Sequence, residues 1–263
     1  MNLLLENKVV VVTGASKGLG YAAALQFSRE KATVIINSRD TDRLAQAAQS
    51  ITNETNMPVI PFSGDITKPE TVKGIVDLIN SQFGKLDILV CNAGGPPAGS
   101  FESFDDDQWQ SAIDLSLMSQ VRLIRETLPL LRKSDTPSVI TVTSVSIKQP
   151  IENLILSNSV RAATAAMTKS LAIELGAENI RFNSILPGWT KTERVENLMK
   201  SRVKANNSSM EEELSKQAAS IPMKRLGEPH EFGNALVFLA SPAASYITGV
   251  MLTVDGGFYR GTA

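Results

Sequence analysis

Short apolar runs alternate along the chain with longer segments in which apolar residues recur every three or four positions. The short runs are rich in β-branched residues, which is typical of buried strands. They lie at Val9–Thr13, Thr33–Asn37, Val59–Ser63, Leu86–Cys91, Val139–Thr143, Ile180–Leu186 and Val250–Val254. The longer segments have helical spacing, as at Leu19, Ala23 and Phe27. This alternation predicts βαβ units, and therefore one doubly wound α/β domain over residues 1–263, with a seven-stranded parallel sheet and helices on both faces.

Two polar segments predict helix starts. Thr67-Lys68-Pro69-Glu70 offers Thr67 as the N-cap, followed by a proline and an acidic residue in the first turn. The acidic residues of 105–107, which precede Trp109, have the same form.

Residues 191–221 depart from the alternating pattern. They are polar and charged, and the stretch of residues 205–209 separates two helix-like parts. A long insertion at the carboxyl edge of a sheet is usually a mobile lid or a surface excursion. We expect a substrate lid here.

Composition narrows the class of protein. With 43% hydrophobic and 20% charged residues, the chain of 263 residues has the balance of a globular protein. The formal net charge of −1 argues against nucleic acid as a partner, because such binding needs clustered cations. The single cysteine excludes an intramolecular disulfide and favours a cytoplasmic setting. No run of about twenty apolar residues is present, so we expect no membrane span. We also expect no metal site.

A glycine-rich loop follows the first predicted strand and opens the first predicted helix. In Thr13–Gly20 the glycines Gly14, Gly18 and Gly20 let the backbone turn tightly and approach a pyrophosphate, whose charge is met by the helix N-terminus. A glycine-rich string alone is a weak signal. Its place between a strand and a helix near the N-terminus predicts a Rossmann-type dinucleotide site.

The spacing of this loop, TGxxxGxG, resembles the short-chain dehydrogenase/reductase family, and further motifs in the family's order extend the resemblance nearly to the C-terminus. It implies a cofactor site, with Ser38 and Arg39 added from the end of the second strand. The expected cofactor-binding residues are Gly14, Ser16, Lys17, Gly18, Leu19, Gly20, Ser38, Arg39, Asp65, Ile66, Asn92, Ala93, Gly94, Arg161, Pro187, Gly188, Thr190 and Thr192. Residues 254–257 are similar to those of tetramer-forming members, which implies a homotetramer, although the nearby apolar residues could equally belong to the core of one chain.

NADP(H) is the expected cofactor. The second strand ends Asn37-Ser38-Arg39, with no acidic residue where a ribose 2′-hydroxyl would need one. Arg39 can bind a 2′-phosphate through paired hydrogen bonds, and Lys17 adds positive charge.

The family's catalytic pattern, Asn-Ser-Tyr-Lys, is only partly present. Ser144 stands at the family's serine, Ser116 at the asparagine, Ser157 at the tyrosine and Arg161 at the lysine, with the register fixed by the similar helix of residues 165–175. Arginine does not give up a proton in a protein, and serine is a poor acid without a base. The resemblance therefore implies a nonstandard site made of these four residues.

Replacement proton donors within reach would be Lys148, Glu152 and Asn153, in the loop after the fifth strand, although each is more often a solvated loop residue. His230 is expected on the surface, and Cys91 is expected to be a small buried apolar residue.

Three functions stay open at this point. The first is an NADP(H)-dependent oxidoreductase that interconverts a carbonyl and an alcohol on a small or acyl substrate. The second is an NADP(H)-binding protein of the same fold with little or no redox activity, in a sensor or assembly role. The third is an acyl-carrier-dependent ketoacyl reductase whose docking patch would be Arg122, Arg125, Arg132 and Lys133, although charges at helical spacing usually form a solvated face.

Overall fold

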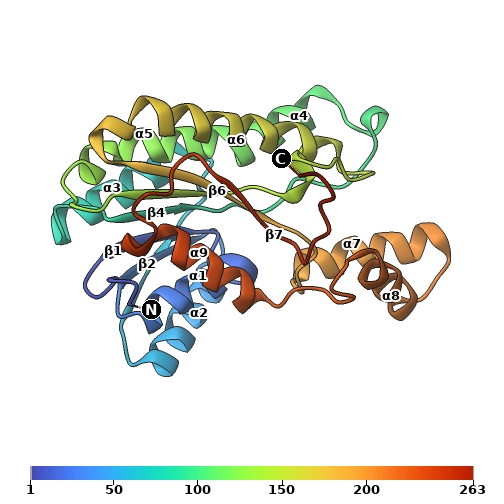
Figure 1. The fold of residues 1–263 in the computed structure, drawn as a ribbon, viewed down its shortest axis with the longest axis horizontal. Coiled ribbons are helices and arrows are strands. Elements are labelled where there is room, and N and C mark those ends of the chain that lie inside the picture. The colour runs from blue at the N-terminus through green and yellow to red at the C-terminus, as the bar shows by residue number, and fades with distance from the viewer. Residues whose placement is uncertain (1, 263) are drawn as a thin grey trace.

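The computed structural model describes residues 2–262, and its centre is one parallel sheet with the strand order β3-β2-β1-β4-β5-β6-β7 (Figure 1). The strands are β1 Val9–Thr13, β2 Thr33–Ser38, β3 Val59–Ser63, β4 Ile88–Cys91, β5 Ser138–Val142, β6 Arg181–Pro187 and β7 Met251–Val254. All seven predicted strands are confirmed, with ends that differ by at most two residues. The fold class predicted from the sequence is therefore confirmed.

Helices cover both faces of the sheet. They are α1 Gly18–Arg29, α2 Thr41–Thr55, α3 Pro69–Gln82, α4 Asp106–Ile113, α5 Ser119–Leu131, α6 Ile155–Glu174, α7 Glu193–Asn206, α8 Met210–Ser220 and α9 Pro229–Ala240. Figure 1 shows α1, α2 and α9 on one side of the sheet and α3, α5 and α6 on the other. Among these helices, none is both long enough and apolar enough to cross a lipid bilayer.

The side chains of each strand alternate between two apolar cores. Val10 and Val12 of β1 pack toward α1 and α9, whereas Val9 and Val11 pack in the core that includes residues of α3 and α5. Since both faces are covered, the strands are continuous apolar runs rather than alternating ones.

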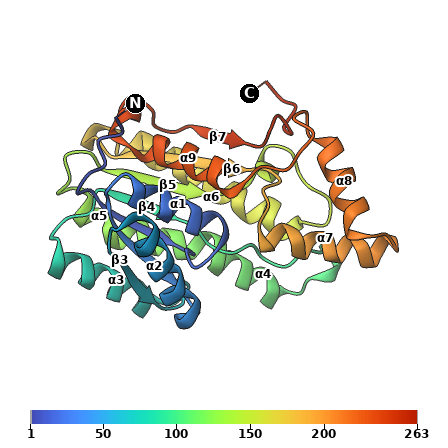
Figure 2. The ribbon, with the colours of Figure 1, turned by 90° about the horizontal axis from the view of Figure 1, so that it is seen from below.

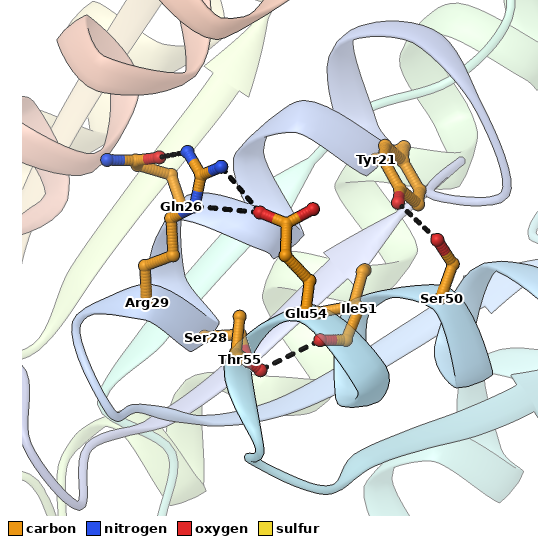
Figure 3. Close-up of polar contacts among 8 residues, drawn as sticks. All are labelled: Tyr21, Gln26, Ser28, Arg29, Ser50, Ile51, Glu54 and Thr55. Atoms are coloured by element: carbon orange, nitrogen blue, oxygen red, sulfur yellow. Dashed lines mark hydrogen bonds and ion pairs between the residues drawn. The ribbon is translucent and has the colours of Figure 1, made fainter.

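Polar contacts align α1 with α2 along their exposed edge (Figure 3). The Tyr21 hydroxyl lies 3.0 Å from the Ser50 hydroxyl, and Arg29 Nε donates to Glu54 Oε1 at 3.1 Å. Ser28 and Thr55 hydroxyls meet at 2.8 Å. These contacts fix the pair of helices that flanks the glycine loop and the end of β2.

The two predicted helix starts have different outcomes. Helix α4 starts where predicted, with Asp105 as its N-cap, and the structure adds a reciprocal capping box between Asp105 and Gln108. The prediction for α3 is wrong by one residue, because Lys68 is the N-cap and Pro69 is the first helical residue. The Thr67 hydroxyl instead donates to Asp65 Oδ1 at 2.9 Å, so it stabilises the loop before the helix.

The strand order reverses between β1 and β4, and this is where a doubly wound sheet leaves a crevice at the carboxyl ends of its strands. Val12 of β1 is paired with Val90 of β4. Just beyond the strands, the Thr13 hydroxyl donates to the carbonyl of Asn92 at 2.7 Å, and the Asn92 amide donates to the carbonyls of Thr13 and Gly14 at 3.1 Å each.

Helices α7 and α8 project from the carboxyl end of the sheet, apart from its two helical layers (Figure 2). They have a small apolar core of their own. Its buried members are Trp189, Val195, Met199, Ile221 and Leu226. The two helix-like parts predicted within residues 191–221 are thus confirmed as helices, and the role of the pair as a lid stays a prediction.

Candidate functional site

One cavity of about 390 Å³ opens at the carboxyl ends of β1, β2, β4, β5 and β6. Every predicted cofactor residue except Gly20 lines it, and so do three of the four predicted catalytic residues. Those three are Ser144, Ser157 and Arg161. The structure therefore brings together residues that are spread from position 14 to position 198 of the chain.

The glycine loop forms a cradle of backbone with no room for a side chain at Gly14 or Gly20. Gly14 and Gly18 have φ angles of +59° and +60°, which other residues rarely adopt. A Cβ on Gly14 would lie 2.8 Å from the Asn92 carbonyl oxygen, and one on Gly20 would lie 2.4 Å from the Gly14 carbonyl oxygen. Gly20 therefore acts beneath the cavity, where it lets α1 pack closely.

The N-terminus of α1 is open toward this cradle. Lys17 is the N-cap and makes no side-chain capping bond, so the first N–H groups of the helix stay available. Free N–H groups and the positive end of the helix dipole suit a pyrophosphate. The residues present thus fit a dinucleotide at this end of the cavity.

The carboxyl ends of β2 and β3 contribute groups that suit the adenosine part of a dinucleotide. The Ser16 and Ser38 hydroxyls lie 2.9 Å apart, and Arg39 is exposed, with no ion pair to another residue in the range 2–262. Asp65 Oδ1 accepts hydrogen bonds from the Thr67 N–H and hydroxyl, both at 2.9 Å. A free guanidinium beside hydroxyl groups matches a 2′-phosphate.

Two serine hydroxyls face the other end of the cavity. Ser144 Oγ accepts a hydrogen bond from the Ser146 N–H at 3.1 Å, which leaves the Ser144 hydrogen free to donate. Ser157 lies on the first turn of α6, is 6% exposed, and its hydroxyl forms no hydrogen bond with any described residue. Both hydroxyls can therefore donate to an oxygen of a bound molecule.

Arg161 is fixed at the base of the cavity by four backbone carbonyls. Its Nη1 donates to Val142 and Thr143 at 2.9 and 3.0 Å, and its Nη2 donates to Ala93 and Gly94 at 3.4 and 3.3 Å. Burial, together with the nearby charge of Arg194, lowers the pKa of Arg161 to about 10. The guanidinium stays charged at neutral pH, so it supplies positive charge and no proton.

Ser116 does not line the cavity. It lies in a π-helical turn, Asp114–Met118, where its hydroxyl is buried without a hydrogen-bond partner among the described residues. Its carbonyl accepts from the Gln120 amide at 3.0 Å and from the Thr164 hydroxyl at 2.8 Å. The backbone of this turn therefore holds α6 in place, while the predicted catalytic role of the Ser116 side chain stays a prediction.

The candidate replacement donors lie outside the cavity lining. Lys148 Nζ lies 5.1 Å from the centre of the Tyr259 ring, and Glu152 and Asn153 are exposed. His230 is exposed, as predicted.

Cys91 is buried, as predicted, and burial raises the pKa of its thiol, so it is an inert core residue. No group of three or more His, Cys, Asp or Glu side chains that could hold a metal ion occurs in residues 2–262.

The predicted basic docking patch is largely neutralised within the chain. Arg122 pairs with Asp114 at 3.4 Å, and Arg132 pairs with Glu178 at 2.6 Å. Arg125 pairs with the glutamate that follows it. Three of the four basic residues are therefore engaged in ion pairs, which weakens the case for an acidic partner at this face.

Sequence reasoning missed the wall that the α7 segment contributes to the cavity. The residues it adds are Trp189, Glu193, Arg194, Val195 and Leu198. Lys17 of the glycine loop pairs with Glu193 at 2.6 Å, and Arg194 Nη2 donates to the Pro96 carbonyl at 2.6 Å. Glu193 and Arg194 directly follow Thr192, which was expected to bind the cofactor. This position at the start of the predicted lid could have indicated that both residues line the cavity.

Comparisons with known proteins agree with this site. A family model described as enoyl-(acyl carrier protein) reductase matches residues 14–259. The NADPH-dependent reductase BacG of Bacillus subtilis (strain 168) is 29% identical over 96% of this chain and 98% of its own length. L-rhamnose 1-dehydrogenase (NAD(P)(+)) of Sphingomonas sp. (strain SKA58) is 32% identical over 97% of this chain and 98% of its own.

The crystal structure of L-sorbose reductase from Gluconobacter frateurii, in complex with NADPH and L-sorbose, superposes with a TM-score of 0.94 at 34% identity, covering 99% of this chain and all of that one. The chain therefore belongs to the short-chain dehydrogenase/reductase family. The family and the oxidoreductase class predicted from the sequence are confirmed, and the relatives' use of NADPH agrees with the predicted cofactor.

Proposed function

We propose that this protein uses NADPH to reduce a carbonyl group to an alcohol on a small or acyl substrate, and catalyses the reverse reaction with NADP⁺. One continuous cavity, lined by Arg39 and Asp65 as well as by Ser144 and Ser157, carries this proposal. A dinucleotide that spans this cavity would set its reactive ring beside the two serine hydroxyls. Relatives with NADPH-dependent reductase activity support the same assignment.

Arg39, Ser38 and Ser16 would hold the 2′-phosphate of the cofactor, and the open N-terminus of α1 would hold its pyrophosphate. Asn92, Ala93 and the loop that begins at Pro187 would border the ribose and the nicotinamide, as they do in the family. When bound, NADPH supplies the hydride.

The chain's own residues would act on the substrate oxygen. Ser144 would donate a hydrogen bond to the carbonyl oxygen and polarise it, since the other side of its hydroxyl is occupied by the Ser146 N–H. The fixed cation of Arg161 would stabilise negative charge that develops on that oxygen. Because Arg161 keeps its proton, the proton would come from water, with the free hydroxyl of Ser157 as the relay.

Helices α7 and α8 would form the lid over the substrate. Val195 and Leu198 of α7 line the cavity together with Ile151 and Leu154, and the pairs Lys17–Glu193 and Arg194–Pro96 hold the start of α7 against the cofactor loops. A lid that excludes water strengthens the electrostatic contacts beneath it.

We further assign the protein to the cytoplasm, as the single cysteine indicates.

A binding role without efficient turnover is the second candidate, because the phenol and the lysine of the family are absent and Arg161 is committed to backbone carbonyls. The test mixes the protein with NADPH and a panel of ketones, aldehydes and acyl thioesters, and follows nicotinamide absorbance. Saturable consumption of NADPH with one substrate class supports the reductase. Tight NADPH binding with no consumption across the panel contradicts it and supports the binding role.

A further inference from the structure

Besides Arg39 at the cofactor end, two arginines line the cavity with no carboxylate to neutralise either of them. Neither Arg161 nor Arg194 forms an ion pair with any residue in the described range. The cavity lining contains two acidic residues, and both are engaged elsewhere. Asp65 accepts from Thr67, and Glu193 is held by Lys17. The cavity is therefore electropositive away from its cofactor loops.

Arg194 has free donors. It is half-buried at the start of α7 and lies over Gly95, where a Cβ would approach its Nε to 2.9 Å. Its Nη2 donates to the Pro96 carbonyl at 2.6 Å, and its Nε and Nη1 form no hydrogen bond with residues 2–262. The Pro96 contact fixes the direction of the guanidinium, so its remaining N–H groups are preorganised for a ligand.

Arg161 cannot offer its terminal nitrogens to that ligand, because they donate to four carbonyls. The positive charge of Arg161 still acts on other groups in the cavity. Arg194 is close enough for its charge to contribute to the lowered pKa of Arg161, and two like charges in a partly buried cavity repel each other. An anion beside Arg194 would remove this repulsion.

We propose that the carbonyl substrate carries a carboxylate that pairs with Arg194, while its hydrocarbon part lies along Ile151, Leu154 and Leu198. This inference rests on the proposed reductase function, since it assigns the anion to the molecule that is reduced. A carboxylate brings one charge and accepts two parallel N–H groups of a guanidinium. A phosphate would bring a second charge, and both terminal nitrogens of Arg161 already donate to backbone carbonyls.

The test is equilibrium binding to the NADPH-saturated protein by isothermal titration calorimetry, with hexanoate as the probe and hexanamide as its neutral analogue. We expect hexanoate to bind about tenfold more tightly or better, as expected for one charge-assisted pair. Arg194→Gln should reduce this preference to within about twofold, and Arg194→Lys should restore part of it. The matched control Lys204→Gln removes an exposed cation of the same helix, away from the cavity, and should leave the preference unchanged.

Equal affinities of the unmodified protein for hexanoate and hexanamide would overturn the carboxylate site. So would an Arg194→Gln variant that binds NADPH about tenfold more weakly but keeps the preference for hexanoate, because Arg194 would then serve the cofactor. Turnover is measured separately, with 2-oxohexanoate and its methyl ester. If hexanoate discrimination depends on Arg194 while no carbonyl compound is reduced, the reductase proposal fails and the anion site stands.

Discussion

Arg161 donates to four backbone carbonyls, two just after β4 and two at or just after the end of β5, and so it joins two strands of the sheet where the cofactor loops begin. A lysine at this position would have three donors on one nitrogen and could not span the same groups. Arg161 thus has a structural role besides its positive charge, which is the charge of the family's lysine in the alignment that the resemblance implies. The same alignment places the Ser157 hydroxyl where the family has a phenol.

Restoring the family's pair should raise the rate. Ser157→Tyr with Arg161→Lys should increase kcat/KM for a ketone by about 10²–10⁴, since that is the usual contribution of a positioned general acid, while the Kd for NADPH changes little. Stopped-flow measurement of NADPH consumption checks this.

The control for the restored pair is Ser157→Phe with Arg161→Lys, which adds the ring without its hydroxyl and should show no gain. Rapid ketone reduction by the unmodified protein would mean that the missing phenol does not limit the rate. So would an equal gain in kcat/KM for the Ser157→Phe, Arg161→Lys control.

Arg39 should decide between the two nicotinamide cofactors. Arg39→Ala should weaken NADPH binding by about tenfold or more, because a charge-assisted pair to the 2′-phosphate is lost, and should leave NADH binding nearly unchanged. Fluorescence titration with both cofactors measures this. Arg43→Ala is the matched control, because Arg43 is exposed nearby but pairs with Asp40 and Glu193. Similar losses for NADPH and NADH in Arg39→Ala would contradict the assignment.

At the scale of elements, the turn between α7 and α8 is built around one buried carboxylate. Glu213 Oε1 accepts hydrogen bonds from the Ser208 hydroxyl at 2.7 Å, the Asn206 amide at 3.1 Å and Lys216 at 3.2 Å. The first of these contacts has the largest effect, and together they lower the pKa of Glu213 from 4.5 to about 2. The charged form therefore stabilises the pair of helices.

The stability of α7 and α8 should depend on this charge. Because the pKa is lower in the folded state, the contribution of Glu213 is fully present above about pH 4.5 and is lost as the pH falls toward 2. Glu213→Gln should therefore increase hydrogen exchange in residues 193–220 at pH 7, and the difference from the unmodified protein should narrow below pH 4.5.

Glu211→Gln, at an exposed glutamate in the first turn of the same helix, is the control for Glu213 and should behave like the unmodified protein. If exchange in Glu213→Gln equals that of the unmodified protein at pH 7, the carboxylate does not hold the turn.

At the scale of the whole molecule, we predict the homotetramer that the family resemblance implies. β7 is an edge strand with a half-exposed apolar face, and Ile173 of α6 and Tyr246 are 75% and fully exposed. Apolar surface of this kind is usually covered in an assembly. Light scattering at micromolar concentration should give four times the chain mass of 28.3 kDa, and Ile173→Asp should shift the protein toward smaller species. A chain mass of one copy would refute the tetramer.

The sequence located most of the cofactor site because the residues that hold a dinucleotide follow strand ends within short motifs. Gly14, Arg39 and Asn92 each directly follow or end a strand, so the parallel order alone brings them to one edge. Gly20 was placed in the cavity but lies beneath it, and Ser116 was expected among the reacting groups but lies buried in a π-helical turn. Periodicity says which face is buried, but not which side chain reaches a cavity.

Local pattern by itself determined the seven strands, their parallel direction and the glycine cradle, because each depends on neighbours in the chain. Tertiary structure decided the contacts of Ser157 and Arg161, the residues at the positions where the resemblance implies the family's tyrosine and lysine. Only the fold reveals that the Arg161 guanidinium is committed to carbonyls near positions 93 and 142, and that Arg194, from a helix about thirty residues further along the chain, brings an unpaired charge into the same cavity. Such contacts depend on distances between elements, and no residue spacing along the chain encodes them.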